Sequence, residues 1–159
     1  MKTRQFLGKG LITAMVMASA VLFTSCDKDD DDTPMRTYAI SGNASGSQVV
    51  PAVAGTGTGT IVGTYNPNNH MLTYTTTWTG LTGAPTAGSF YSGASGANGT
   101  AVGTGWTFDP ASTGTGTMAG TMTLTDAQAA ELTAGGWYYT YSTAANPTGE
   151  VRGQIVATQ

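Results

Sequence analysis

Apolar and threonine residues alternate with a period of two in several segments of the chain. In residues 71–81, Leu72, Tyr74 and Trp78 fall on one face, whereas threonines occupy most of the other. This alternation predicts a half-buried antiparallel strand, with one face against a core and the other in solvent. Residues 115–124 and 137–143 show the same alternation, and the turn at 66–69 predicts a hairpin with a strand over 58–65. We expect a first strand over residues 38–41 and a last one over 151–157.

A segment near residues 126–133 breaks this pattern and predicts one short helix. Thr125 and Gln128 have the spacing of a capping box, in which each side chain bonds the backbone N–H of the other residue. Good helix formers follow, and the pair Gly135–Gly136 ends them. Roughly six to eight short strands with hairpin turns and one helix predict an all-β fold, an antiparallel β-sandwich or barrel.

Residues 1–25 have the pattern of an export signal. Lys2, Arg4 and Lys9 form a positive start, and residues 11–23 are an uninterrupted run of apolar or small residues. This run is shorter than the about 20 residues that a spanning helix needs, and it suits a signal peptide. The run ends just before the only cysteine of the chain. A lone cysteine also excludes an internal disulfide.

The residues around that cysteine resemble the lipobox of bacterial lipoprotein precursors. They read Leu-Phe-Thr-Ser-Cys over residues 22–26. The resemblance implies that the thiol of Cys26 is acylated, with palmitate among the acyl chains, and that residues 1–25 are removed. Two or more acyl chains give stable membrane anchoring. The alternative is an ordinary signal peptide followed by an incidental cysteine.

An acidic segment follows the cysteine, and we expect residues 26–36 to form a solvated, disordered tether. A cysteine followed by a lysine and an acidic run resembles the surface-export signal of Bacteroidota lipoproteins. The resemblance implies a surface-exposed protein of the outer membrane, with a periplasm-facing location as the alternative. The residues that would carry this signal are Lys28, Asp29, Asp30, Asp31 and Asp32.

Charge is sparse in the remaining segment, residues 37–159, which has the length of one domain with one core. Its only Lys or Arg is Arg152. So few cations leave no electrostatic footprint for nucleic acid, which we exclude as a partner. Arg152 and Glu150 share a face of the predicted last strand, and we expect both to be structural, paired with each other or with neighbours.

Six segments resemble, in order, the CHRD domain, a chordin-like module common in bacterial secreted proteins. The resemblance covers about residues 38–156 and implies an immunoglobulin-like β-sandwich or barrel without established enzymatic activity. The segments are SQVVPAV at 47–53, the hairpin end LTY at 72–74, LTG at 81–83, LTDAQ at 124–128, GG at 135–136 and TAANPTGEVRGQI at 143–155.

Bacterial members of that family usually carry three histidines that this chain lacks. Alignment of the flanking residues places Ser89, Tyr91 and Ser142 at those positions. Paired imidazoles would suit a transition metal, whereas these side chains do not. We therefore expect no metal site and no cofactor. The remaining histidine, His70, lies beside an Asn-rich turn and is expected to be solvated.

The candidate chemistry favours a binding module over an enzyme. The domain has no cysteine, no histidine placed to activate a serine, and no recognisable carboxylate pair. We therefore expect a non-catalytic, lipid-anchored binding or adhesive module at the cell surface, with a glycan or protein ligand. Tyr138 lies on the less aromatic face of its predicted strand and is the candidate ligand contact.

Two alternative functions rest on the threonine faces of the strands. In the first, the domain is a self-associating structural component of the cell surface, joined through threonine faces or strand edges. A third, weaker alternative is ice or mineral binding by the ladder of Thr73, Thr75, Thr77 and Thr79. Ordinary sheet twist argues against a flat ladder.

Overall fold

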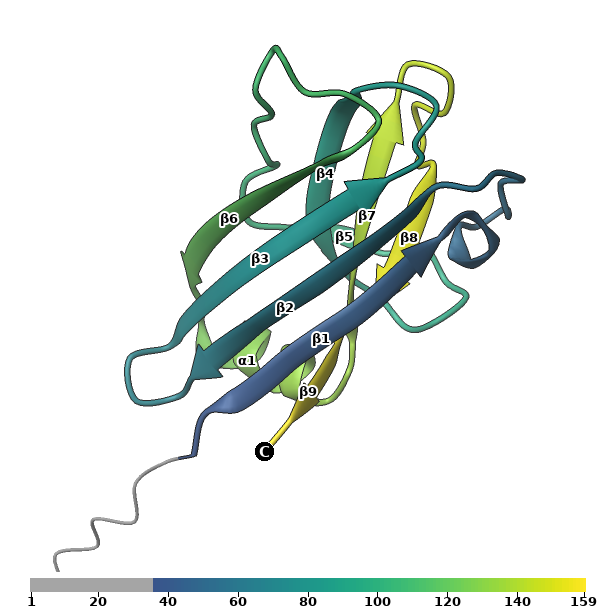
Figure 1. Cartoon of the computed structure of the whole chain (residues 1–159). Helices are drawn as coiled ribbons and strands as arrows, with labels where there is room; N and C mark the ends of the chain where they lie inside the picture. Colours follow the sequence, from purple (N-terminus) through teal and green to yellow (C-terminus); the bar gives the residue numbers. More distant parts are fainter. Residues whose placement is uncertain (1–35) are drawn as a thin grey trace, which may run out of the picture. The chain divides into compact units, whose positions relative to one another are not determined.

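One antiparallel sheet, curled into a half-barrel, organises residues 36–159, which are the residues that the computed structural model describes (Figure 1). The strands follow the order β5-β4-β7-β8-β1-β2-β3-β6, and β9 also pairs with β1. The predicted all-β fold with one short helix is confirmed. The predictions for residues 1–25, for Cys26 and for the acidic signal at 28–32 lie outside the described residues. No helix in the described part is long and apolar enough to cross a membrane.

The strands and helices have these bounds: β1 Tyr38–Ser45, η1 Gly46–Gln48, β2 Thr58–Asn66, β3 Met71–Thr79, β4 Pro85–Ser92, β5 Thr100–Val102, β6 Gly116–Thr123, α1 Asp126–Thr133, β7 Trp137–Thr143, β8 Val151–Gln154 and β9 Val156–Thr158.

Strand β3 shows the predicted alternation along its whole length. Its even-numbered residues from Leu72 to Trp78 are buried and its odd-numbered residues from Met71 to Thr79 are exposed. Buried Thr76 satisfies its hydroxyl by donating to the Thr60 carbonyl oxygen at 2.9 Å. β3 therefore turns an apolar face to the core and a threonine face to solvent.

The helix forms where the capping box predicts it. Gln128 N–H donates to Thr125 Oγ1 at 3.3 Å, and Thr125 N–H donates to Gln128 Oε1 at 3.0 Å. Gly135 follows the helix with a φ of 74°, a conformation that glycine adopts without steric cost. The helix buries Leu132 and Ala129, which closes one end of the core.

Strands β4 and β5 were not predicted. β4 contains glycine and serine where an amphipathic strand would carry larger residues, so its alternation is weak. The glycine is needed, because a Cβ at Gly88 would lie 2.7 Å from the Trp106 ring. Trp106 instead packs on Phe90 with ring centroids 5.1 Å apart. This places an aromatic cluster inside the curl of the sheet.

Strand β7 departs from the predicted one-sided burial, since all its residues from Trp137 to Thr143 are buried. Trp137, Tyr139 and Tyr141 belong to the core, as expected for most of the aromatic residues. The other face of β7 is buried too. There the loop between β4 and β5 contacts Tyr138, whose hydroxyl accepts a hydrogen bond from Gly99 N–H at 2.9 Å. This covered outer face of β4, β7 and β8 holds the candidate site.

Candidate ligand-binding pocket

A pocket of about 390 Å³ lies against the outer face of β7 and β8. Three loops contribute to it: the segment after η1, the β4–β5 loop and the turn before β8. The strands contribute one aromatic pair, one hydroxyl and one cation. The lining residues are Val49, Val50, Pro51, Tyr91, Asn98, Gly99, Tyr138, Thr140, Thr148 and Arg152.

Arg152 is the only charged residue in this lining, and only 2% of it is exposed. Its Nη2 donates to the Ala94 carbonyl oxygen at 2.8 Å. Its guanidinium carbon lies 3.6 Å from the centroid of the Tyr138 ring, which is cation–π geometry. Nη1 has no hydrogen-bond partner within the described part of the chain. The guanidinium is thus buried with part of its donor capacity unused.

Within residues 36–159, no carboxylate balances this cation. Among residues 36–159, the only ion pair within 4.0 Å joins His70 and Asp126, in another part of the fold. Burial lowers the pKa of Arg152, but an arginine remains protonated at any ordinary pH. The pocket wall therefore holds a positive charge that the surrounding residues solvate only in part.

Tyr138 supports the pocket from the side of the sheet. Its ring stacks on Tyr91 with centroids 5.1 Å apart and an angle of 11° between the planes. Only 3% of Tyr138 is exposed, whereas Tyr91 is half-buried. Tyr138 is therefore a wall of the pocket and not an exposed stacking residue, and a direct ligand contact by it stays a prediction.

The β4–β5 loop is tied to the sheet at several points. Gly93 N–H donates to the Gly136 carbonyl oxygen at 2.7 Å, and Gln154 Nε2 donates to the Gly93 carbonyl oxygen at 3.0 Å. Asn98 Nδ2 donates to the Val50 carbonyl oxygen at 3.0 Å and thereby joins two walls of the pocket. These bonds hold the pocket in a preformed shape.

The three positions at which the family resemblance implies histidines lie on this same outer face. In the β4–β7 register, Ser89 is opposite Thr140, Tyr91 is opposite Tyr138 and Ser142 is opposite Ala87. The β7–β8 register places Arg152 opposite Thr140 on the other side. The described residues contain no group of three or more His, Cys, Asp or Glu side chains arranged for a metal. In this chain, two serines and a tyrosine therefore occupy these positions, and Thr140 of β7 lies between Ser89 and the buried Arg152.

Glu150 is buried but does not pair with Arg152. Its Oε1 accepts from Thr82 N–H at 2.7 Å, and its Oε2 accepts from the hydroxyls of Thr82 at 2.6 Å and Thr143 at 2.5 Å. Burial opposes the ionisation of this carboxyl, but the hydrogen bonds from Thr143 and Thr82 outweigh it and lower its pKa. Glu150 thus fixes the β3–β4 loop to the end of β7.

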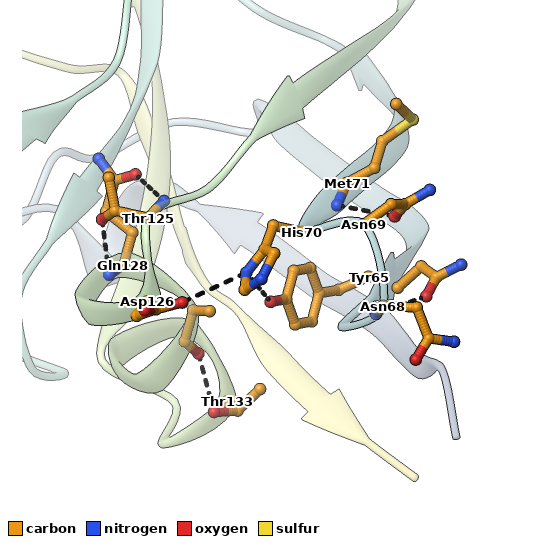
Figure 2. A network of polar contacts seen from close by, with 11 residues as sticks. Tyr65, Asn68, Asn69, His70, Met71, Thr125, Asp126, Gln128 and Thr133 are labelled. Atoms are coloured by element: carbon orange, nitrogen blue, oxygen red, sulfur yellow. Dashed lines mark hydrogen bonds and ion pairs between the residues drawn. The ribbon is translucent and has the colours of Figure 1, made fainter. Parts of the chain in front are cut away.

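His70 lies far along the sheet from the pocket residues, in the β2–β3 turn, where Figure 2 shows it pointing toward Asp126 and Tyr65. Its Nδ1 is 3.5 Å from Asp126 Oδ1 and 3.5 Å from the Tyr65 hydroxyl. The side chain of His70 is 43% exposed and that of Asp126 is 95% exposed. The contact joins the turn to the start of α1, and it builds no enclosed site.

Sequence reasoning missed the loop residues of the pocket. Val50, Asn98 and Thr148 lie in segments without periodicity, and they meet only because the sheet curls. The one usable signal was Arg152 itself, the single Lys or Arg in a segment of more than 120 residues, with Glu150 two residues before it.

Comparison with known proteins gives one match. The family model of the CHRD domain matches residues 40–155, nearly all of the described domain. Neither the curated proteins nor the solved structures contain a significant match to this chain.

Proposed function

The chain belongs to the CHRD domain family, and from this premise we propose that it is a lipid-anchored, non-catalytic binding module of the outer membrane surface. The observation that carries the binding role is the preformed pocket beside Arg152. A concave site with apolar and aromatic walls and a few placed polar groups is the usual form of a ligand site. The ligand is a glycan or a protein segment.

The membrane role rests on the sequence of the N-terminal segment. Cys26 follows an apolar run too short to span a bilayer, and acylation there by palmitate and a second lipid anchors the chain. The acidic run after it favours a solvated tether between the lipid and the β domain. Lys28 and the aspartates at 29–32 direct the protein to the outer face.

A catalytic role is not proposed, because Glu150 and Asp109 have structural roles in the described domain. The Glu150 carboxylate accepts three hydrogen bonds from threonines and is only 2% exposed, so it is shielded from a substrate. Exposed Asp109 accepts the Ala111 N–H at 2.7 Å within a turn.

The first experiment treats intact cells with a protease and follows the β domain by immunoblotting. We expect the domain to be removed from wild-type cells, and metabolic labelling with a palmitate analogue to mark the protein. Cys26→Ser loses the label, and replacing residues 28–32 with alanine protects the domain from the protease. A glycan and protein array with the full-length protein then tests binding. Protection of the wild-type domain, or an array without any signal, contradicts the proposal.

Self-association is a second candidate, favoured by the edges of the sheet. Within residues 36–159, β5 and β6 are the end strands, and an end strand presents backbone groups for pairing with another chain. Light scattering of the full-length protein in detergent tests it, since the micelle mass is measured separately. A mass of one chain per micelle at all concentrations removes this candidate.

A further inference from the structure

We propose that the pocket beside Arg152 binds the carboxylate-bearing ring of an acidic sugar, such as a uronic acid residue of a polysaccharide. The inference deepens the proposed binding function and rests on it. It names the ligand class through the chemistry of the pocket lining.

The negative charge of the ligand follows from the state of Arg152. A buried cation without a counterion is costly, and partial solvation by one carbonyl and one ring leaves Nη1 unused. The guanidinium fork matches a carboxylate in bidentate geometry. No acidic residue lines the pocket, so an incoming carboxylate meets attraction alone. Nη1 itself is buried, so contact with a ligand requires a side-chain adjustment of a kind common at binding sites.

The sugar ring follows from the rest of the lining. Tyr91 offers a half-exposed aromatic face, and Val50 and Pro51 add apolar surface. Asn98 and Thr148 are exposed at the pocket and supply amide and hydroxyl groups for sugar hydroxyls. The volume of about 390 Å³ is near the lower end of the range for small-ligand sites, about 300–1,000 Å³. It suits one ring better than an extended peptide.

A purely structural Arg152 would be explained by its bond to Ala94 and its contact with Tyr138 alone. Those two contacts already hold the β4–β5 loop and use Nη2 and the guanidinium face. They do not explain why the remaining donor stands at a pocket, on the same row of the sheet as Ser89, whose buried Oγ also lacks a partner among the described residues. The unused buried donor of Arg152, a residue of the pocket lining, points to a ligand.

Calorimetric titration of the full-length protein in detergent tests the inference with trigalacturonic acid, the matching neutral galactose trisaccharide, and an acidic tripeptide. We expect binding of the trigalacturonic acid and at least roughly tenfold weaker binding of the neutral trisaccharide, the loss expected for a charge-assisted hydrogen bond. Arg152→Gln should weaken binding of the acidic sugar by roughly tenfold or more. Equal binding of both sugars, or binding of the peptide alone, overturns the inference.

A second pair of variants decides the matter if Arg152→Gln fails to fold. Thr148→Trp fills the pocket from an exposed turn while Arg152 itself is retained, and it should abolish binding of the acidic sugar. Ala144→Trp adds the same ring to an exposed position of the same turn outside the pocket lining, and it should leave binding unchanged. Unchanged binding in Thr148→Trp places the ligand elsewhere and refutes the pocket. If the array finds other ligands while the acidic sugar fails here, the proposed binding function stands and this inference falls.

Discussion

The two halves of the curled sheet use similar strands in different surroundings. In one half, β3 exposes every second residue from Met71 to Thr79. In the other half, β7 is buried on both faces from Trp137 to Thr143. The difference arises because loops cover the outer face of β7 and β8 and are tied to it by hydrogen bonds.

That covering determines which chemistry each half contains. The exposed half presents uncharged hydroxyls to water, and in water each hydroxyl contributes little free energy to an interaction. The covered half contains Glu150 and Arg152, both only 2% exposed. Away from water, hydrogen bonds and charges interact more strongly, and unpaired groups cost more. We therefore expect selective recognition in the covered half, and the following substitutions test how far the two halves differ.

The largest effect is expected from the core of the covered half. Trp137 is fully buried and packs on Phe90 with ring centroids 5.7 Å apart. Trp137→Ala should lower the free energy of unfolding by about 3–5 kcal/mol, through lost burial and the cavity left behind. Urea denaturation of the full-length protein measures it. In the exposed half, Val62→Thr should change the same quantity by less than about 0.5 kcal/mol, because Val62 is 58% exposed. Similar losses at both sites would contradict the comparison.

The next effect concerns the buried carboxylate of the covered half. Glu150→Gln replaces a charged acceptor of three hydrogen bonds with a neutral amide. The free energy of unfolding at neutral pH should fall by about 2 kcal/mol, as expected for bonds to a charged group. Glu131→Gln is the control, since Glu131 is exposed on α1, and it should have little effect. An equal loss in both variants would show that the threonine bonds contribute nothing specific.

The same carboxyl gives the stability a pH dependence of known sign. The pKa of Glu150 in the folded protein lies below its ordinary value of 4.5. The ionised group therefore stabilises the fold above that value, and the contribution is lost as the pH falls toward the folded pKa. Urea midpoints below about pH 4.5 should fall more steeply for wild type than for Glu150→Gln. Parallel curves would mean that the carboxyl has the same pKa folded and unfolded.

The comparison also explains which features the sequence could predict. Alternation predicts β2, β3 and β6 because one face is in water, and the spacing of Thr125 and Gln128 predicts α1. Alternation does not predict β4, because glycine and serine occupy positions where larger apolar residues would mark a buried face. It does not predict the burial of both faces of β7 either, because the loops that cover its outer face are distant in sequence. The pocket joins Val50, Asn98 and Arg152, whose proximity depends on the curl of the sheet and on no local pattern.

A smaller effect separates the two faces within β3 itself. Thr76 is buried, and since its hydroxyl donates to Thr60, the Tyr141 hydroxyl 2.5 Å away donates to it. Thr76→Val leaves that tyrosine hydroxyl buried without its acceptor, and should lower the free energy of unfolding by about 1–2 kcal/mol. Thr75→Val, on the exposed face of the same strand, should change it by less than about 0.5 kcal/mol. Urea denaturation measures the free energy of unfolding of both variants. An equal loss in Thr75→Val and Thr76→Val would show that the two faces of β3 do not differ in this respect.

The smallest effect is expected from the threonine ladder of the exposed half, which we expect to produce no thermal hysteresis in freezing solutions. Neighbouring strands of a sheet are rotated by about 20–25°, so the rows of hydroxyls on β2, β3 and β6 do not form one plane that matches a crystal. The hydroxyls are also engaged with one another, since Thr60 Oγ1 and Thr77 Oγ1 are 2.7 Å apart. Nanolitre osmometry of the full-length protein checks this. If the wild-type protein shows thermal hysteresis and Thr77→Lys does not, the threonine ladder recognises ice. The exposed half would then have a recognition function, contrary to our expectation.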